Sequence, residues 1–317
     1  MVTAMAISQR LLAIVMLVAM TAILPEMLSG NTTAPVLFRP DAFIFFSFAY
    51  GLPILVIREW AIRLGLGKGG VFLAGMAYGL INEGLLAKTI FRESGVPIDL
   101  FDHYGFAFGV NFPWALFICV WHALSSVLFP IALAQHFAGP VGALPWLGKW
   151  TAFVLAALAV ALASVFFLND ETTGARGEPA ILASLWATMA VLAFAASRLR
   201  ATPAFSPSDG LWKPWAFGLA GLPLMIALLL FARFDAPAPV YLAAFAAIAA
   251  FWVWFIHRQG WFGQPAFCRV ALGWYTQMVG FSWFSMIHRS PVTIAVGVVA
   301  LALIHWLNLR AERRIAP

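Results

Sequence analysis

The sequence predicts an all-α polytopic membrane protein, a transmembrane helical bundle of about ten spans in a single integral membrane domain, residues 1–317. Hydrophobic residues make up 63% of the chain and charged residues only 10%, and the mean hydropathy is +0.90. Soluble domains are nearer half apolar and a quarter charged. The apolar residues also fall in runs of roughly 20, the length that a helix needs to cross a bilayer.

These runs are separated by short segments rich in proline, glycine and charge, which predict the loops. The predicted spans are residues 11–29, 41–60, 70–90, 111–134, 150–168, 179–197, 213–232, 239–257, 269–287 and 292–308. The first run follows Arg10 and resembles a signal peptide, but no small-residue cleavage site follows it, so we expect a retained helix. We expect neither an internal repeat nor a separate soluble domain.

Positive charge is distributed unevenly between the two sides of the predicted bundle. An even number of spans places both termini on one side, together with 13 of the 19 Lys and Arg residues. These are Arg10, Arg58, Arg63, Lys68, Lys149, Arg198, Arg200, Lys213, Arg258, Arg269, Arg310, Arg313 and Arg314. Because Lys and Arg mark cytoplasmic loops, we expect a bacterial inner-membrane protein with both termini in the cytoplasm. Acidic residues, including Glu26, favour the opposite side. The net charge of +6 therefore indicates membrane lipids as partners and no nucleic acid.

Residues 74–91, AGMAYGLINEGLLAKTIF, place a carboxylate inside a predicted span. Glu83 lies roughly two-thirds of the way across that span, where an ionisable residue is costly to bury and indicates a functional site. Gly75, Gly79 and Glu83 are spaced by four residues and share one helix face. Small residues on such a face let a neighbouring helix approach closely. We therefore expect Glu83 to point into the bundle.

Other polar residues surround Glu83 in this prediction. Tyr78 and Asn82 form an adjacent polar face of the same helix, and the next span carries His122 and Ser126 on one face. Because consecutive helices are usually neighbours, contact between Glu83 and His122 is expected. A purely structural hydrogen bond is the alternative for both residues.

Four candidates lie near the ends of spans. Lys88 is expected to snorkel to the outer surface, and Arg58 to anchor the cytoplasmic end of the second span. His305 and Asn308 lie one turn apart near the cytoplasmic end of the last span.

The predicted chemistry is confined to part of the bundle. Residues 150–257 carry no ionisable residue at depth, so the polar-site helices are expected in residues 11–134 and 269–308. The two cysteines, Cys119 and Cys268, offer neither a disulfide framework nor a metal pair. No cofactor and no metal site are expected.

Two stretches carry a resemblance to known proteins. AYGLINEGLLAKTIF and GVNFPWALFICVWHALSSVLFPI are similar to a group of uncharacterised bacterial and archaeal multi-pass proteins. Both patterns also resemble the CAAX-protease and bacteriocin-processing superfamily of glutamic intramembrane proteases. The resemblance implies Glu83 as the water-activating base, His122 as its partner, and His305 with Asn308 as oxyanion donors. The chain departs from the superfamily at Asn82, where the first glutamate of a pair is expected.

Three functions remain open from the sequence. The first is a CAAX-protease-like hydrolase that acts on a membrane protein or peptide. The second is a proton-coupled transporter of a small molecule, in which Glu83 takes up and releases a proton. The third is a non-catalytic membrane subunit, whose polar cluster is structural or binds a lipid-like cofactor. The motifs of zinc proteases, serine hydrolases and P-loop proteins do not occur in the chain.

Overall fold

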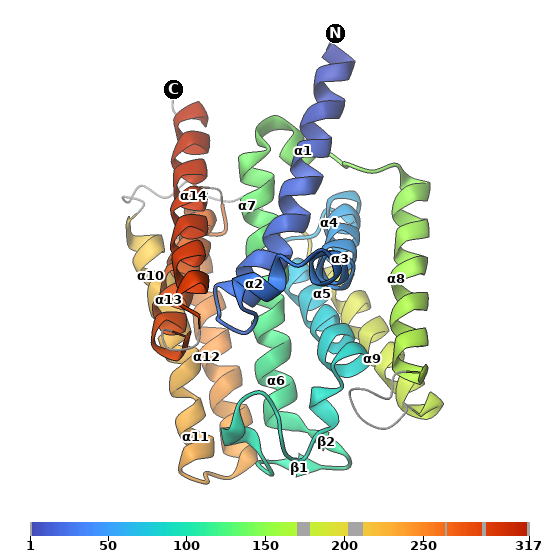
Figure 1. Cartoon of the computed structure of the whole chain (residues 1–317), viewed down its shortest axis with the longest axis vertical. Coiled ribbons are helices and arrows are strands. Elements are labelled where there is room, and N and C mark those ends of the chain that lie inside the picture. Colours follow the sequence, from blue (N-terminus) through green and yellow to red (C-terminus); the bar gives the residue numbers. More distant parts are fainter. Residues whose placement is uncertain (1, 170–177, 202–211, 264, 287–289, 316–317) are drawn as a thin grey trace.

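The computed structural model is a bundle of long helices with one short β-ribbon at one end (Figure 1). It describes residues 2–169, 178–201, 212–263, 265–286 and 290–315. The prediction of an all-α polytopic bundle is confirmed, because nine helices in the described residues are long and apolar enough to cross a membrane.

The elements follow one another in the order that the apolar runs predict. The first half of the chain contains α1 (Val2–Ala22), η1 (Ile23–Met27), α2 (Ala34–Leu37), α3 (Pro40–Phe46), η2 (Ser47–Gly51), α4 (Leu52–Leu64), α5 (Lys68–Leu80), η3 (Ile81–Leu86), η4 (Thr89–Phe91), η5 (Asp99–Phe101), β1 (Phe106–Ala107), β2 (Val110–Asn111), α6 (Phe112–Trp121), η6 (His122–Leu128), α7 (Phe129–Phe137) and η7 (Gly139–Ala143). The second half contains α8 (Lys149–Asn169), α9 (Pro179–Arg198), α10 (Trp212–Ala227), α11 (Leu229–Arg233), α12 (Ala238–Arg258), α13 (Ala266–Met286) and α14 (Pro291–Ile315).

The predicted span 269–287 corresponds to α13, which is less apolar than the helices of the nine other predicted spans. It is 21 residues long and carries Arg269, Thr276 and Gln277. Helices α7, α10 and α14 pack against it, and Trp274 and Tyr275 are almost fully buried. A helix that other helices cover needs fewer apolar side chains than one that faces lipid, which explains the difference in composition.

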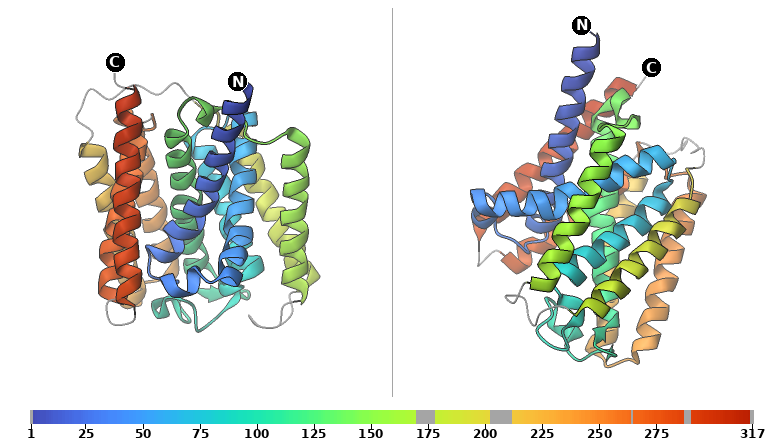
Figure 2. Two further views of the ribbon diagram at one scale, coloured as in Figure 1. Left: turned by 45° about the horizontal axis from the view of Figure 1, so that its top comes forward. Right: turned by 90° about the vertical axis from the view of Figure 1, so that its right-hand side faces the viewer.

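The span formed by α6, η6 and α7 is the centre of the bundle. In its most apolar window 78% of the residues are buried, compared with 17% for α8, α9 and α12. Figure 2 shows this central span between α14 on one side and α8 on the other. Both termini lie at the same end of the bundle, opposite the β-ribbon, as an even number of crossings requires. That this end faces the cytoplasm stays a prediction.

Four spans contain π-helical segments, which are all those of the described residues: η2 and η6 interrupt their spans, and η1 and η3 form the last turns of theirs. Such segments are rare and occur frequently at functional sites. Proline contributes to two of them, because it has no N–H to donate to the preceding turn. Within η2, which precedes Pro53, the Ala49 carbonyl accepts the Tyr78 hydroxyl at 3.1 Å. Within η6, which precedes Pro130, the Ser125 carbonyl accepts the Tyr275 hydroxyl at 2.6 Å.

Candidate functional site: a buried glutamate–histidine pair

Glu83 and His122 are in direct contact inside the bundle, as the sequence predicts. The Glu83 Oε1 atom lies 3.0 Å from His122 Nε2, and Oε2 accepts a hydrogen bond from the Thr89 hydroxyl. On the other side of the imidazole, Nδ1 lies 2.9 Å from the Ser126 hydroxyl. The carboxylate and both ring nitrogens therefore each have a fixed partner, which sets the orientation of the histidine ring.

Two glycines of α5 allow this contact. A Cβ atom on Gly75 would lie 2.7 Å from the Cα of Ala123, and one on Gly79 would lie 2.7 Å from the Cα of Cys119. Both distances are shorter than any ordinary contact, so only glycine fits at these positions. The predicted small-residue face is thus confirmed, and it brings the Glu83 helix close to the backbone of α6 and η6.

Two tyrosines and an amide surround the pair. The ring centroid of Tyr78 lies 5.7 Å from that of His122, and the ring centroid of Tyr50 lies 6.0 Å from it. Asn82 Nδ2 donates to the Tyr78 hydroxyl at 3.0 Å. The sequence predicts Tyr78 and Asn82 beside Glu83. It does not predict Tyr50, which comes from η2.

Glu26 supplies a second buried carboxylate. It lies in η1, is only 6% exposed, and accepts the Tyr50 hydroxyl. Its Oε2 atom also accepts hydrogen bonds from Asn31 Nδ2 at 2.8 Å and from the Thr32 hydroxyl at 2.7 Å. The distribution of charge along the sequence predicts Glu26 on the acidic outer side, although Glu26 falls within the apolar run 11–29. That position inside a span was the signal that could have identified it.

The arrangement can perform acid–base chemistry. Two buried carboxylates are connected through an imidazole and a tyrosine. Glu26 accepts the Tyr50 hydroxyl, the Tyr50 ring lies beside His122, and His122 contacts Glu83. Within the described residues, no group of three or more His, Cys, Asp or Glu side chains is placed to hold a metal ion.

The segment after η3 covers the end of the site that lies toward the β-ribbon. Trp114 Nε1 donates to the Thr89 hydroxyl at 2.9 Å, which ties this segment to α6. The expectation that Lys88 snorkels outward is wrong. Lys88 is only 6% exposed, and its ammonium lies 5.4 Å from the ring centroid of Phe167. Lys88 lies between η3 and η4 and adopts a left-handed conformation with φ 54°, which changes the direction of the chain there.

Comparison with known proteins gives a family. Residues 13–316 match the model of an uncharacterised membrane protein family. The chain belongs to this family. A search of curated proteins found no match, and neither did a search of solved structures. The family match includes every residue of the site described above, so the site lies within the part of the chain that the family shares.

His305 and Asn308 belong to a different group of side chains in this family member. The Nε2 atom of His305 lies 3.2 Å from the Thr276 hydroxyl, and Asn308 Nδ2 donates to Glu312 at 2.7 Å. Glu312 is in turn paired with Arg269. This group links α13 to α14, so the structure does not bring His305 and Asn308 into contact with the Glu83–His122 pair.

Arg58 points into the protein and is exposed to neither lipid nor water. Its side chain is completely buried and lies 2.6 Å from Glu59. It donates to the carbonyls of Gly142 at 2.6 Å and Leu144 at 2.8 Å. Its guanidinium lies 3.5 Å from the ring centroid of Trp146. The expectation of an interfacial anchor is therefore wrong, because Arg58 holds the connection between α7 and α8.

Proposed function

We propose that the protein is a membrane-embedded hydrolase of the glutamic type, with Glu83 as general base and His122 as its partner. The observation that carries this proposal is the 3.0 Å contact between Glu83 Oε1 and His122 Nε2, with Ser126 on the other ring nitrogen. A base that is held by a second group, which is itself oriented by a third, is the arrangement that activates a nucleophile.

Burial assigns different roles to the two members of the pair. The Glu83 side chain keeps 11% of its accessible surface and His122 only 4%, so the carboxylate is the member that a water molecule reaches. In the proposed reaction Glu83 takes a proton from water as the water attacks the substrate carbonyl. Glu83 then gives that proton to the leaving group, while His122, which donates its Nε2–H to Oε1, holds the carboxylate in place, so both residues regain their starting protonation states.

The oxyanion donors differ from those that the CAAX-protease resemblance implies. Since His305 and Asn308 lie elsewhere, we assign this role to the second N–H of the Asn82 amide, whose first N–H donates to the Tyr78 hydroxyl. Glu26 takes the place of the second glutamate, because Asn82 occupies its position in the sequence. It acts through Tyr50, whose hydroxyl it accepts.

The location of the site indicates the substrate class. Glu83 and His122 both lie within apolar spans, Lys68–Leu86 and Phe112–Phe137. A substrate that reaches them must enter the bilayer, as a membrane protein, peptide or lipid does. We further propose that the protein resides in the bacterial inner membrane with both termini in the cytoplasm, following the distribution of Lys and Arg.

Proton-coupled transport is a second candidate, and the four π-helical segments favour it. Segments η2 and η6 interrupt spans, and η1 and η3 carry Glu26 and Glu83 at the ends of theirs. Interrupted helices form the binding sites of many transporters. In this alternative, Glu83 and His122 exchange a proton while the segments around them change conformation.

The two candidates are distinguished by comparing the wild-type protein with Glu83→Gln, both reconstituted in native membrane lipid. Glutamine keeps the shape and the partners of Glu83 but cannot accept a proton. Mass spectrometry of the membrane peptides and lipids detects hydrolysis products, and a pH-sensitive dye inside the vesicles detects proton movement. For a hydrolase, product formation falls by about 10²–10⁴-fold, the contribution of a general base.

Glu93→Gln is the matched control, because Glu93 is 59% exposed in a loop and contacts only His103 among the ion pairs of the described residues. It is expected to retain full activity. Proton movement without products, lost in Glu83→Gln, supports transport and overturns the hydrolase. If wild-type protein shows neither, or Glu83→Gln retains both, the pair is structural.

A further inference from the structure

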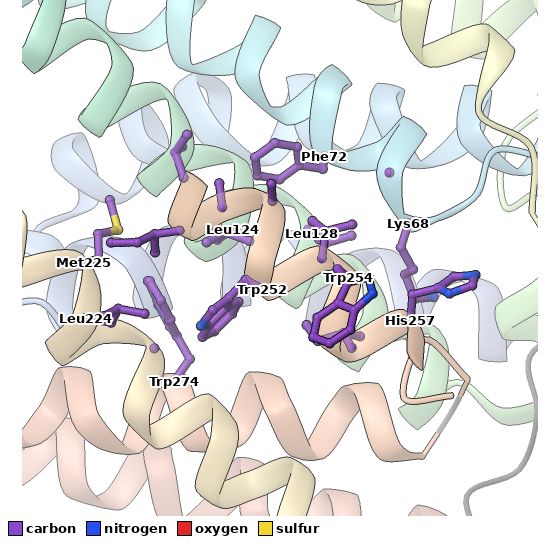
Figure 3. A pocket seen from close by; sticks show the side chains of 18 of the residues that line it. Lys68, Phe72, Leu124, Leu128, Leu224, Met225, Trp252, Trp254, His257 and Trp274 are labelled. Atoms are coloured by element: carbon purple, nitrogen blue, oxygen red, sulfur yellow. The ribbon is translucent and has the colours of Figure 1, made fainter. Parts of the chain in front are cut away.

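A large apolar pocket lies on the opposite side of the central span from Glu83. Its volume is about 660 Å³, within the range of about 300–1,000 Å³ that is typical of ligand sites. Helices α5, α6, α10, α12 and α13 contribute to its walls, with η6 between α6 and α7. Figure 3 shows Phe72, Leu124, Leu128, Trp252 and Trp274 around it. Side chains of this kind fit a hydrocarbon chain.

The polar groups of the pocket are gathered at one end. Lys68 and His257 lie together there, beside Trp254, whereas Leu224 and Met225 lie at the other end (Figure 3). Lys68 begins α5, and His257 is the penultimate residue of α12. Both therefore lie at the end of the bundle that carries the termini, while the middle of each helix lines the apolar part. The pocket thus runs from the membrane interface toward the bilayer centre, as a phospholipid of that leaflet does.

The charge at the interfacial end is positive, and the described residues place no carboxylate against it. Among the described residues, no Asp or Glu lines the pocket, and no carboxylate forms a salt bridge with Lys68. The Lys68 ammonium lies 5.3 Å from the ring centroid of Phe267. An ammonium group at the membrane interface, next to an apolar pocket and without a counter-ion, favours an anionic headgroup.

We propose that this pocket binds one anionic phospholipid, with its phosphate at Lys68 and His257 and an acyl chain between α12 and the central span. Helix α12 is only lightly packed, with 17% of its span buried, so a lipid can enter beside it. Val120, Leu124 and Leu128 line the pocket. On the other side of the same span, His122 contacts Glu83 and Ser126 contacts His122. The bound lipid is therefore separate from the proposed hydrolase site and does not depend on it.

The headgroup is tested by native mass spectrometry of the full-length protein in micelles that contain equimolar phosphatidylglycerol and phosphatidylcholine with identical acyl chains. Wild-type protein is expected to retain phosphatidylglycerol preferentially. Lys68→Ala reduces this preference by about fivefold, since one lysine contributes about 1 kcal/mol toward anionic lipid, and Lys68→Arg restores it. Lys149→Ala is the matched control, because Lys149 begins α8 and is exposed away from the pocket. Equal retention of both lipids by the wild type, or an unchanged preference in Lys68→Ala, overturns the proposal.

The acyl-chain site is tested by filling it. Ala249 lines the pocket from α12, so Ala249→Phe is expected to lower retention of both lipids at least tenfold. Ala246 lies one turn earlier, is exposed and does not line the pocket, so Ala246→Phe leaves retention unchanged. Thermal unfolding of both variants shows whether they fold as the wild type does. A folded Ala249→Phe protein that still retains lipid, or equal losses in both variants, overturns the proposal.

Discussion

The Gly79→Ala substitution tests whether close packing of α5 against α6 positions the Glu83–His122 pair. The new Cβ atom would lie 2.7 Å from the Cα of Cys119, and ordinary contact begins at 3.4 Å. The two helices must therefore separate by about 0.7 Å at this point. His122 follows Cys119 by less than one turn, so its 3.0 Å distance to Glu83 grows to about 3.7 Å, beyond the range of a hydrogen bond.

The stability change has two opposing parts. Overpacking at a backbone contact costs about 1–3 kcal/mol, and alanine gains up to about 1 kcal/mol over glycine in a helix interior. The expected net destabilisation is about 1–2 kcal/mol. Gly280→Ala is the control, because a Cβ atom at Gly280 of α13 has no described atom within 4 Å and should leave stability unchanged or slightly raised.

Two measurements on purified protein check this prediction. Denaturant unfolding in mixed micelles gives the change in stability, and nitrogen NMR of histidine-labelled protein reports the hydrogen bond at His122 Nε2. The His122 signal is assigned by its loss in His122→Gln. If Gly79→Ala retains the wild-type signal and unfolds like Gly280→Ala, then close approach of these helices does not hold the pair together.

Three other substitutions test the surroundings of the site by their effect on unfolding in micelles. Arg58→Met leaves Glu59 buried without its closest guanidinium partner and should lower the free energy of unfolding by about 3–5 kcal/mol. Arg63→Met should lower it by under about 1 kcal/mol, because the Arg63–Glu59 pair is partly exposed and 3.8 Å long. Equal effects of the two substitutions would contradict the buried role of Arg58. Asn111→Ala removes the cap that accepts the Trp114 N–H at 3.1 Å and should cost about 1–2 kcal/mol, so an unchanged midpoint would argue against the cap. Glu26→Leu deprives the Tyr50 hydroxyl of its acceptor and should cost about 1–3 kcal/mol; a stabilised variant would show that Glu26 is not paired as described.

Local patterns were sufficient to predict the centre of the site. The four-residue spacing of Gly75, Gly79 and Glu83 identified the face of α5 that meets α6, because helix geometry fixes which side chains share a face. The order of the spans then identified His122 as the partner of Glu83. Both steps depend only on neighbours along the chain, and the structure contains both contacts.

Long-range contacts could not be predicted in the same way. Tyr50 and Glu26 reach the pair from η2 and η1, whose π-helical geometry has no clear sequence pattern apart from the prolines near them. The resemblance implied that His305 and Asn308 join Glu83, but α14 packs on α13 and places them with Thr276 and Glu312. No periodicity along a helix specifies which distant helix packs against it.

The sequence by itself determined that this chain crosses the membrane many times as helices. Its apolar runs are long enough to span a bilayer, and every backbone N–H and C=O group in hydrocarbon must be paired within the protein, as it is in a helix. It also determined which face of α5 is turned inward. Only the tertiary structure decided that a second buried carboxylate, Glu26, is linked to the site through Tyr50 and that Arg58 is buried. It alone also showed that an apolar pocket opens beside Lys68. These features depend on how helices far apart in the sequence are arranged around the central span, and that arrangement follows from the packing of the whole bundle.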